Sequence, residues 1–329
     1  MVSQRQKRTL TPGKLRGLQQ CASPEGIFTI LALDHRRVVQ ETFGGSPQGL
    51  FPAAAAFKKD VVAGLAPAVT AVLLDPQFGG GPQLSDGSLP GGLGLLLSVE
   101  KSGYSGTSGN RLSRVAQGWG VDKIKRCGAS AVKFLAFYHP ESPHAEATRQ
   151  MVAQVAEECR RCDLAYFLEP MSFKLETEDG RRSSLSHRQV VVQTAADLSG
   201  LGADILKVEF PEDAAQVKDE GAWAEACAEL DAASAIPWVL LSAAVDYDTF
   251  LRQSELACQA GASGILAGRS IWKEALGMGE EARREFLNGL ARQRMQRLRE
   301  VCQHSARPFT GWVEYVPAGE NWPQEYAGF

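Results

Sequence analysis

The stretch ADILKVE, residues 203–209, is a short and almost continuous apolar run that carries a lysine near its end. Runs of this length fit strands that are covered on both faces, as in a parallel sheet. Seven similar runs occur along the chain, with segments of helical spacing between them. These seven are Phe28–Asp34, Val69–Leu74, Gly94–Val99, Ala131–Tyr138, Ala165–Glu169, Pro237–Ser242 and Gly261–Gly268. Eight strand–helix units predict an α/β fold whose parallel strands close into a (β/α)8 TIM barrel.

The predicted barrel spans about residues 27–305 and forms a single domain with the rest of the 329-residue chain. Barrels of this class routinely reach this length as one domain. We expect residues 1–26 to form a helical extension, and the aromatic-rich tail after Ala306 to pack as extended structure. A doubly wound open sheet is the alternative fold, but no G-x-G-x-x-G pattern follows the first strand as that fold would favour.

Composition and charge narrow the range of partners. The chain is 44% hydrophobic and carries a net charge of −3, which gives no reason to expect nucleic acid or a membrane surface as a partner. Its apolar stretches are too short to span a bilayer, and its basic, polar N-terminus lacks the apolar core of a secretory signal. We therefore expect a cytoplasmic protein.

The seven cysteines include one C-x-x-C pair, Cys159 and Cys162. A redox pair of this kind normally opens a helix, where the helix dipole favours the thiolate, whereas this pair closes a segment of helical spacing. A structural zinc site would need two further ligands, and no second C-x-x-C supplies them. We expect reduced thiols.

Ionisable and small polar residues gather at the ends of the predicted strands. They are Asp34, His35, Arg36, Arg37, Glu100, Lys101, Lys133, Glu169, Lys207, Glu209, Ser242, Gly268 and Arg269. In a barrel of this type, the C-terminal ends of the strands carry the active site. The chemistry of this protein is therefore expected at that end.

Two of these residues, Lys133 and Lys207, lie inside apolar strands. A buried lysine is costly unless it is paired, and both desolvation and a neighbouring ammonium favour the neutral amine that can attack a carbonyl. The alternative is an inert buried ion network in which Asp34, Glu169 and Glu209 neutralise the two lysines. Two lysines with matched carboxylates at strand ends favour catalysis.

The last two strands indicate an anion site. They end in LLSAAV and ILAGRS, where small residues expose backbone N–H groups and where Ser242 and Arg269 add further donors. Loops after strands seven and eight of a barrel commonly bind phosphate. We expect Ser242, Ala243, Gly268 and Arg269 to bind a phosphate. The alternative is that Gly268 only permits a tight turn and Arg269 pairs on the surface.

These stretches together resemble the tagatose-1,6-bisphosphate aldolase family, which includes sulfofructose-phosphate aldolases and related transaldolases. The similar motifs are LTPGKLRGLQ, ILALDHR, VLLDPQFG, GLLLSVEKSGY, GASAVKFLAFYHP, FLEPMSF, ADILKVEFP, LSAAV and GILAGRSIWKEA, which cover nearly the whole predicted barrel. The resemblance implies a class I aldolase with Lys207 as the Schiff-base lysine and Glu169 as the acid/base. It further implies Asp34 and Lys133 as charged helpers, and Ser242, Gly268 and Arg269 as the phosphate site.

Two motifs depart from the family pattern. The L-S-A-G-V of the family is here L-S-A-A-V, with Ala244 in place of glycine, and its D-Q-R is here Asp34-His35-Arg36-Arg37. We expect His35 and Arg37 to contact the far end of the substrate. The second departure leaves the aldehyde half of the substrate unassigned, and we expect Ala244 to tighten the anion loop. The stereochemistry at C4 is also unassigned, because it depends on the exact placement of the carboxylates.

The resemblance implies reversible cleavage of a ketose 1,6-bisphosphate, such as tagatose 1,6-bisphosphate, to dihydroxyacetone phosphate and glyceraldehyde 3-phosphate, without a cofactor or metal. The alternatives are a 6-deoxy-6-sulfofructose-1-phosphate aldolase, a sulfofructose transaldolase, or a non-catalytic sugar-phosphate sensor. A zinc aldolase is a further rival, but the five histidines include no H-x-H or H-E-x-x-H pattern. We also expect a homo-oligomer, a dimer or tetramer.

Overall fold

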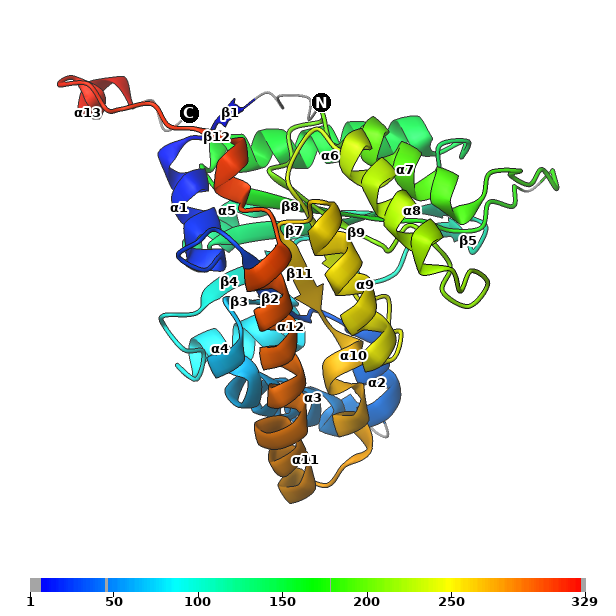
Figure 1. Cartoon of the computed structure of the whole chain (residues 1–329). Coiled ribbons are helices and arrows are strands. Elements are labelled where there is room, and N and C mark those ends of the chain that lie inside the picture. The colour runs from blue at the N-terminus through cyan, green and yellow to red at the C-terminus, as the bar shows by residue number, and fades with distance from the viewer. Residues whose placement is uncertain (1–6, 45–46, 178, 327–329) are drawn as a thin grey trace.

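The computed structural model describes residues 7–44, 47–177 and 179–326, and its centre is a closed barrel of eight parallel strands (Figure 1). The order of strands around the barrel is β10-β11-β2-β3-β4-β7-β8-β9. In chain order they are β2 (Phe28–Leu33), β3 (Ala71–Leu74), β4 (Gly94–Ser98), β7 (Ala131–Phe137), β8 (Ala165–Met171), β9 (Ile205–Val208), β10 (Trp238–Leu241) and β11 (Gly264–Ala267). All eight predicted strands are present, which confirms the barrel.

Helices surround the barrel on its outside (Figure 1). The longer ones are α3 (Pro47–Leu65), α6 (Ala145–Arg161), α7 (His187–Leu198), α8 (Glu220–Ala233), α9 (Tyr247–Ala260) and α12 (Arg292–Ser305). Shorter ones are α2 (Arg37–Phe43), α4 (Gly81–Ser85), α5 (Val121–Arg126), α10 (Arg269–Trp272), α11 (Glu280–Phe286) and α13 (Trp322–Glu325). A small antiparallel hairpin, β5 (Ser105–Thr107) and β6 (Asn110–Leu112), follows β4.

Alternation along each strand separates two hydrophobic layers. In β9, Leu206 and Val208 pack into the layer between strands and helices, whereas Ile205 packs into the barrel interior. In β7, Val132 and Phe134 belong to the outer layer. Because side chains alternate between the two faces of a strand, Lys207 and Lys133 must project into the barrel interior.

The N-terminal end of the barrel is closed by α1 (Pro12–Cys21). Leu18 and Cys21 of this helix belong to the same buried cluster as Phe28 and Phe167 of the barrel interior. Gly17 permits the close approach, because a Cβ atom there would lie 2.2 Å from the carbonyl oxygen of Ser130. The extension predicted before the barrel is therefore a helix that covers one end of it, and residues 1–6 lie outside the described part.

The C-terminal tail is packed only in its first part. Phe309, Trp312 and Val313 are buried, and β12 (Val313–Glu314) pairs in parallel with β1 (Arg8–Thr9). Residues 314–326 are exposed, although the hydroxyl of Tyr326 donates to the carboxylate of Asp163. The expectation of a packed tail therefore holds for residues 309–313, and beyond them the tail keeps this contact at Tyr326; residues 327–329 lie outside the described part. Because the tail pairs with the segment preceding α1, it lies at the barrel end opposite the predicted site (Figure 1).

Candidate active site

Lys207 projects from β9 into the barrel and is buried, with 3% of the residue exposed. Its Nζ lies 2.8 Å from Oε1 of Glu169, which projects from the adjacent strand β8. Both residues belong to the set of charged side chains expected at the strand ends. The structure therefore brings the predicted nucleophile and the predicted acid/base into direct contact.

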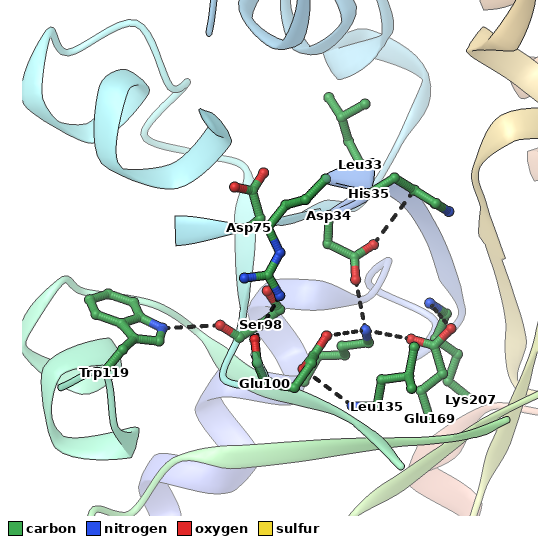
Figure 2. A network of polar contacts seen from close by, with 12 residues as sticks. Leu33, Asp34, His35, Asp75, Ser98, Glu100, Trp119, Leu135, Glu169 and Lys207 are labelled. Atoms are coloured by element: carbon green, nitrogen blue, oxygen red, sulfur yellow. Dashed lines mark hydrogen bonds and ion pairs between the residues drawn. The ribbon is translucent and has the colours of Figure 1, made fainter. Parts of the chain in front are cut away.

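Lys133 is the centre of a charged network, and Figure 2 shows three other members of that network, Asp34, Glu100 and Glu169, pointing toward one another. The Nζ of Lys133 lies 2.7 Å from a carboxylate oxygen of each of three acidic residues: Asp34 after β2, Glu100 after β4, and Glu169. Glu169 uses Oε2 for this contact and Oε1 for Lys207, so one carboxylate joins the two lysines. The four predicted catalytic residues thus form one connected group.

Mutual attraction outweighs burial in this network. Burial opposes charge on Lys133, but Asp34, Glu100 and Glu169 raise its pKa well above the usual lysine value. Burial also opposes ionisation of Asp34 and Glu169, yet Lys133 and Lys207 hold the pKa of each carboxyl below its usual value. At neutral pH, Lys133 is therefore a fixed cation between ionised carboxylates. The prediction that Lys207 is unprotonated stays a prediction.

His35 lies between Asp34 and the loop that follows strand β11. Its Nδ1 is 3.8 Å from Oδ1 of Asp34, and its ring contacts Trp272 edge-on, with 5.3 Å between centroids. Burial lowers the pKa of His35 to about 3, so the imidazole is neutral. A Cβ atom at Gly268 would approach the His35 ring to 3.3 Å, which places His35 beside the predicted phosphate loop.

The loops after β10 and β11 meet at the predicted phosphate site. The backbone N–H of Gly268 donates to Oγ of Ser242 over 3.2 Å. Arg269 is partly buried, and its Nε is buried with no hydrogen-bond partner among the described residues. Burial lowers the pKa of this guanidinium, although Asp34 and Glu169 oppose that effect. A desolvated guanidinium without a bonded partner is suited to an anionic ligand.

Ala243 and Ala244 adopt left-handed backbone conformations, with φ of 44° and 66°. Residues with a Cβ atom rarely adopt this conformation, and each does so at a cost of about 1–2 kcal/mol. The loop retains its tight turn, in which the N–H of Val245 donates to the carbonyl of Ser242 over 3.1 Å. The replacement of glycine by Ala244 therefore leaves the loop shape in place but strains its backbone.

The two adjacent arginines after His35 point in different directions. The side chain of Arg37 is 87% exposed and pairs with Glu41 over 2.7 Å on the surface of α2. Arg36, which was expected only as one of the charged residues after the first strand, donates from Nη2 to the backbone carbonyl of Glu100 over 2.6 Å. The structure thus brings Arg36, and not Arg37, to the charged network.

Glu100 was expected at a strand end, either in contact with substrate or in a surface ion pair with Lys101. It is instead buried, at 7% exposure, and bonds to Lys133 and to the backbone N–H of Leu135, the latter over 3.2 Å. Lys101 is exposed. The signal that could have identified Glu100 is its position directly after an apolar strand.

Glu209 follows β9 and accepts a hydrogen bond from the backbone N–H of Ser172 over 2.6 Å. Burial raises the pKa of Glu209, and the negative charge of Glu169 adds to that effect. Glu209 does not pair with Lys207 among the described contacts. It therefore lies beside the network without neutralising it.

A second ion pair supports the network from outside the barrel. Lys58 of α3 and Asp75 after β3 pair with both side chains fully buried. Lys58 also donates to the carbonyl of Leu33 over 2.8 Å, and Leu33 directly precedes Asp34. Asp75 accepts from the backbone N–H of Phe78 over 2.7 Å. This pair therefore joins α3 to the ends of β2 and β3.

No group of three or more histidine, cysteine, aspartate or glutamate side chains among the described residues is arranged to hold a metal ion. No helix in the same part of the chain is long and apolar enough to cross a membrane. All seven cysteines are free thiols, and Cys159 of the C-x-x-C pair is buried.

Comparison with known proteins places the chain in a family. Residues 28–274 match the profile of the DeoC/LacD family aldolase. A tagatose 1,6-diphosphate aldolase of Streptococcus agalactiae serotype V is 30% identical, over 93% of this chain and 99% of that protein. The corresponding protein of Listeria monocytogenes serotype 4a is 29% identical, over 93% and 96%.

Solved structures share the fold. A structure described as a Schiff-base-forming fructose-1,6-bisphosphate aldolase has a TM-score of 0.58 and 18% identity, over 87% of this chain and 98% of that chain. A fructose-bisphosphate aldolase from Slackia heliotrinireducens has a TM-score of 0.60 and 15% identity, over 94% and 93%. At these identities the likeness concerns the fold alone. With the sequence match over most of the barrel, this chain belongs to the DeoC/LacD family of aldolases.

Proposed function

We propose that this aldolase acts through a Schiff base on Lys207 and cleaves a ketose 1-phosphate that carries a second anionic group. One observation carries the proposal: a buried lysine contacts a carboxylate at 2.8 Å, and the other oxygen of that carboxylate is bound by a second lysine. Formation and dehydration of a carbinolamine require a nucleophilic amine with a neighbouring group that carries protons.

The first half of the reaction joins the enzyme to the substrate. The neutral Nζ of Lys207 attacks C2 of the ketose, and the carbonyl oxygen gains a proton to give a carbinolamine. Glu169 transfers protons between nitrogen and oxygen, and loss of water then leaves an iminium. Lys133, held as a cation by three carboxylates, stabilises negative charge that develops on oxygen.

Cleavage follows from the iminium. Glu169 accepts the proton of the C4 hydroxyl, the C3–C4 bond breaks, and its electron pair moves into the iminium to form an enamine. The aldehyde leaves, C3 of the enamine is protonated, and water hydrolyses the resulting iminium to release dihydroxyacetone phosphate and Lys207. The iminium acts as the electron sink, so the proposal requires no metal or cofactor.

The 1-phosphate is assigned to the loops after β10 and β11. Ser242, the amides near Ala243 and Gly268, and the guanidinium of Arg269 lie together there. Binding the phosphate at this fixed point would place C2 of the substrate beside Lys207 on the adjacent strand β9. His35 lies next to Gly268 and so bounds the same space.

Tagatose 1,6-bisphosphate, cleaved to dihydroxyacetone phosphate and glyceraldehyde 3-phosphate, is the first choice of substrate. The family membership and the names of the Streptococcus and Listeria relatives support it. The 6-sulfonated ketose phosphate, and transfer to another aldehyde, use the same enamine and stay as alternatives. We place the reaction in the cytoplasm and expect a homo-oligomer, both as predictions from the sequence.

Borohydride reduction in the presence of dihydroxyacetone phosphate tests the proposal. The expected result is one stable adduct on the peptide that contains Lys207, found by peptide mass mapping, with no loss of adduct after EDTA treatment. The variant Lys207→Met should form none, whereas Lys101→Met, which removes an exposed lysine, should react normally. An adduct on another lysine, or none in the wild type, would overturn the Schiff-base assignment.

A further inference from the structure

Arg111 of β6 has an environment that the proposed reaction does not yet use. Its guanidinium carbon lies 4.9 Å from the ring centroid of Tyr104, 5.2 Å from that of Phe137 and 5.9 Å from that of Phe173. Its Nε donates to the carbonyl of Ser108 over 2.8 Å. Among the described residues no carboxylate lies within ion-pairing distance of Arg111. A partly buried guanidinium held by three rings thus lacks a counter-charge.

Phe137 fixes the position of Arg111 relative to the charged network. Phe137 is the last residue of β7, four positions after Lys133 on the same strand. An even separation puts both side chains on the interior face, with Phe137 nearer the C-terminal mouth. Arg111 therefore lies at the mouth of the barrel, on the side of β7 and above Lys133.

The opposite side of the mouth holds Arg269, whose guanidinium also has no carboxylate partner among the described residues. Arg269 directly follows Gly268, at the end of β11. Around the barrel, three strands separate β11 from β7 in either direction, so the two strands lie opposite each other. Lys207, Glu169 and Lys133 lie on the strands along one of these two paths. A substrate that contacts both arginines therefore spans the mouth of the barrel, into whose interior Lys207 projects.

We propose that Arg111 binds the anionic group, phosphate or sulfonate, at the end of the aldehyde half of the substrate. This inference rests on the proposed function and extends it: Arg269 binds the anion of the dihydroxyacetone half, and Arg111 binds the anion of the other half. The enzyme thereby selects aldehydes with a terminal anion.

The chemistry of the Arg111 site suits that task. A guanidinium offers paired donors that match the oxygens of phosphate and sulfonate, and stacking on rings fixes its plane without using those donors. Because Nε is bound to Ser108, the two terminal nitrogens are left to face a ligand. The three rings also exclude water from one side of the guanidinium, which strengthens its attraction for an anion.

Aldol addition to dihydroxyacetone phosphate tests the inference, because the donor stays constant while the acceptor changes. The acceptors are glyceraldehyde 3-phosphate, 3-sulfolactaldehyde and uncharged glyceraldehyde. For Arg111→Met we expect kcat/KM with the preferred anionic acceptor to fall about 10- to 100-fold, mainly through KM. With glyceraldehyde it should be unchanged. Arg111→Lys, which keeps the charge but loses the planar fork, should lie in between.

Arg114→Met is the matched control, because Arg114 is exposed, is close to the same hairpin, and its Nε lies 3.5 Å from Oγ of Ser105. Equal losses for all acceptors in Arg111→Met, equal effects of Arg114→Met, or no effect of either would overturn the inference. Borohydride trapping of dihydroxyacetone phosphate on Lys207 should stay at the wild-type level in each variant, which shows that the fold and the Schiff-base site are intact. Loss of trapping in the wild type would instead contradict the proposed function.

Discussion

Glu169 contacts Lys207 at 2.8 Å through Oε1, and its second oxygen is already bound by Lys133. This sharing fixes the orientation of the carboxylate, because neither oxygen can move without breaking an ion pair. It also gives the two lysines different surroundings: Lys133 is bonded to three carboxylates and Lys207 to one. The three carboxylates raise the pKa of Lys133 and keep it a cation, whereas Lys207, with one carboxylate beside it, is the residue that we propose as the nucleophile.

Glu169→Gln separates proton transfer from Schiff-base formation. The amide keeps nearly the same shape but cannot accept the C4 hydroxyl proton, so kcat for cleavage should fall about 10²- to 10⁴-fold. Trapping of dihydroxyacetone phosphate on Lys207 should be slower but still reach completion. Steady-state kinetics and adduct mass spectrometry measure the two effects. Equal loss of both, with the fold intact by circular dichroism, would show that Glu169 acts mainly by holding Lys207.

Glu100→Gln tests the network member for which the sequence predicted no catalytic role. Lys133 would lose one of three bonded carboxylates in a buried site, which should lower the free energy of unfolding by about 1–3 kcal/mol. Activity should fall as well, because Lys133 and Asp34 are no longer held in place. Urea unfolding measures the first effect. Glu176→Gln, which breaks an exposed pair with Arg182, should change stability by less than about 1 kcal/mol and serves as the control.

The lowered pKa values of Asp34 and Glu169 predict the direction of the acid response. A carboxyl with a lower pKa in the folded protein than in the unfolded chain stabilises the fold above its unfolded value of about 4, and that stabilisation is lost as the pH falls through its folded pKa. Wild-type protein and Asp34→Asn should therefore differ most in unfolding free energy near pH 7. The difference should shrink below about pH 4. Urea titrations at several pH values check this, and a constant difference would contradict it.

The raised pKa of Lys133 predicts how stability changes at high pH. A lysine with a higher pKa in the folded protein stabilises the fold below its unfolded value of about 10.4, and the stabilisation is lost as the pH rises through the folded pKa. Lys133→Met should therefore be less stable than the wild type throughout the neutral range. The gap between the two should begin to narrow only at pH values above that of free lysine. Unfolding measured from pH 7 to 11 gives the result.

Ala244→Gly should stabilise the protein, because Ala244 has a φ of 66° that glycine adopts without strain. The expected gain in unfolding free energy is about 1 kcal/mol, reduced by the greater freedom of glycine in the unfolded chain. Ala153→Gly, on the exposed face of helix α6, should instead destabilise by about 1 kcal/mol. A loss of stability in Ala244→Gly would show that the loop does not adopt the left-handed turn.

Much of the site was predictable from the sequence. The apolar runs indicate the strands and place Lys133, Glu169 and Lys207 within or at the ends of them, whereas the roles of these residues were implied by the family resemblance. The choice between Arg36 and Arg37 was not predictable in this way, because it depends on α2 beginning at Arg37. One residue of shift in a helix start changes which side chain turns toward the barrel.

Other members of the site depend on contacts between distant segments. Lys58 lies in a helix, where a lysine usually faces solvent, and only the packing of α3 against β2 and β3 brings it to Asp75 and Leu33. The guanidinium of Arg111 is positioned by the rings of Tyr104, Phe137 and Phe173, which lie 7, 26 and 62 positions away in the sequence. A single sequence contains no local signal for either arrangement.

The helix α1, which closes the N-terminal end of the barrel, leaves the C-terminal mouth as the path to the candidate site. Leu18 and Cys21 pack into the interior at the closed end, so we expect substrate to enter and products to leave through the mouth. In the proposed mechanism the dihydroxyacetone half stays tethered to Lys207 until water arrives, so the aldehyde must leave first. Release is then sequential, and in the condensation direction the tethered half must already be in place when the aldehyde enters.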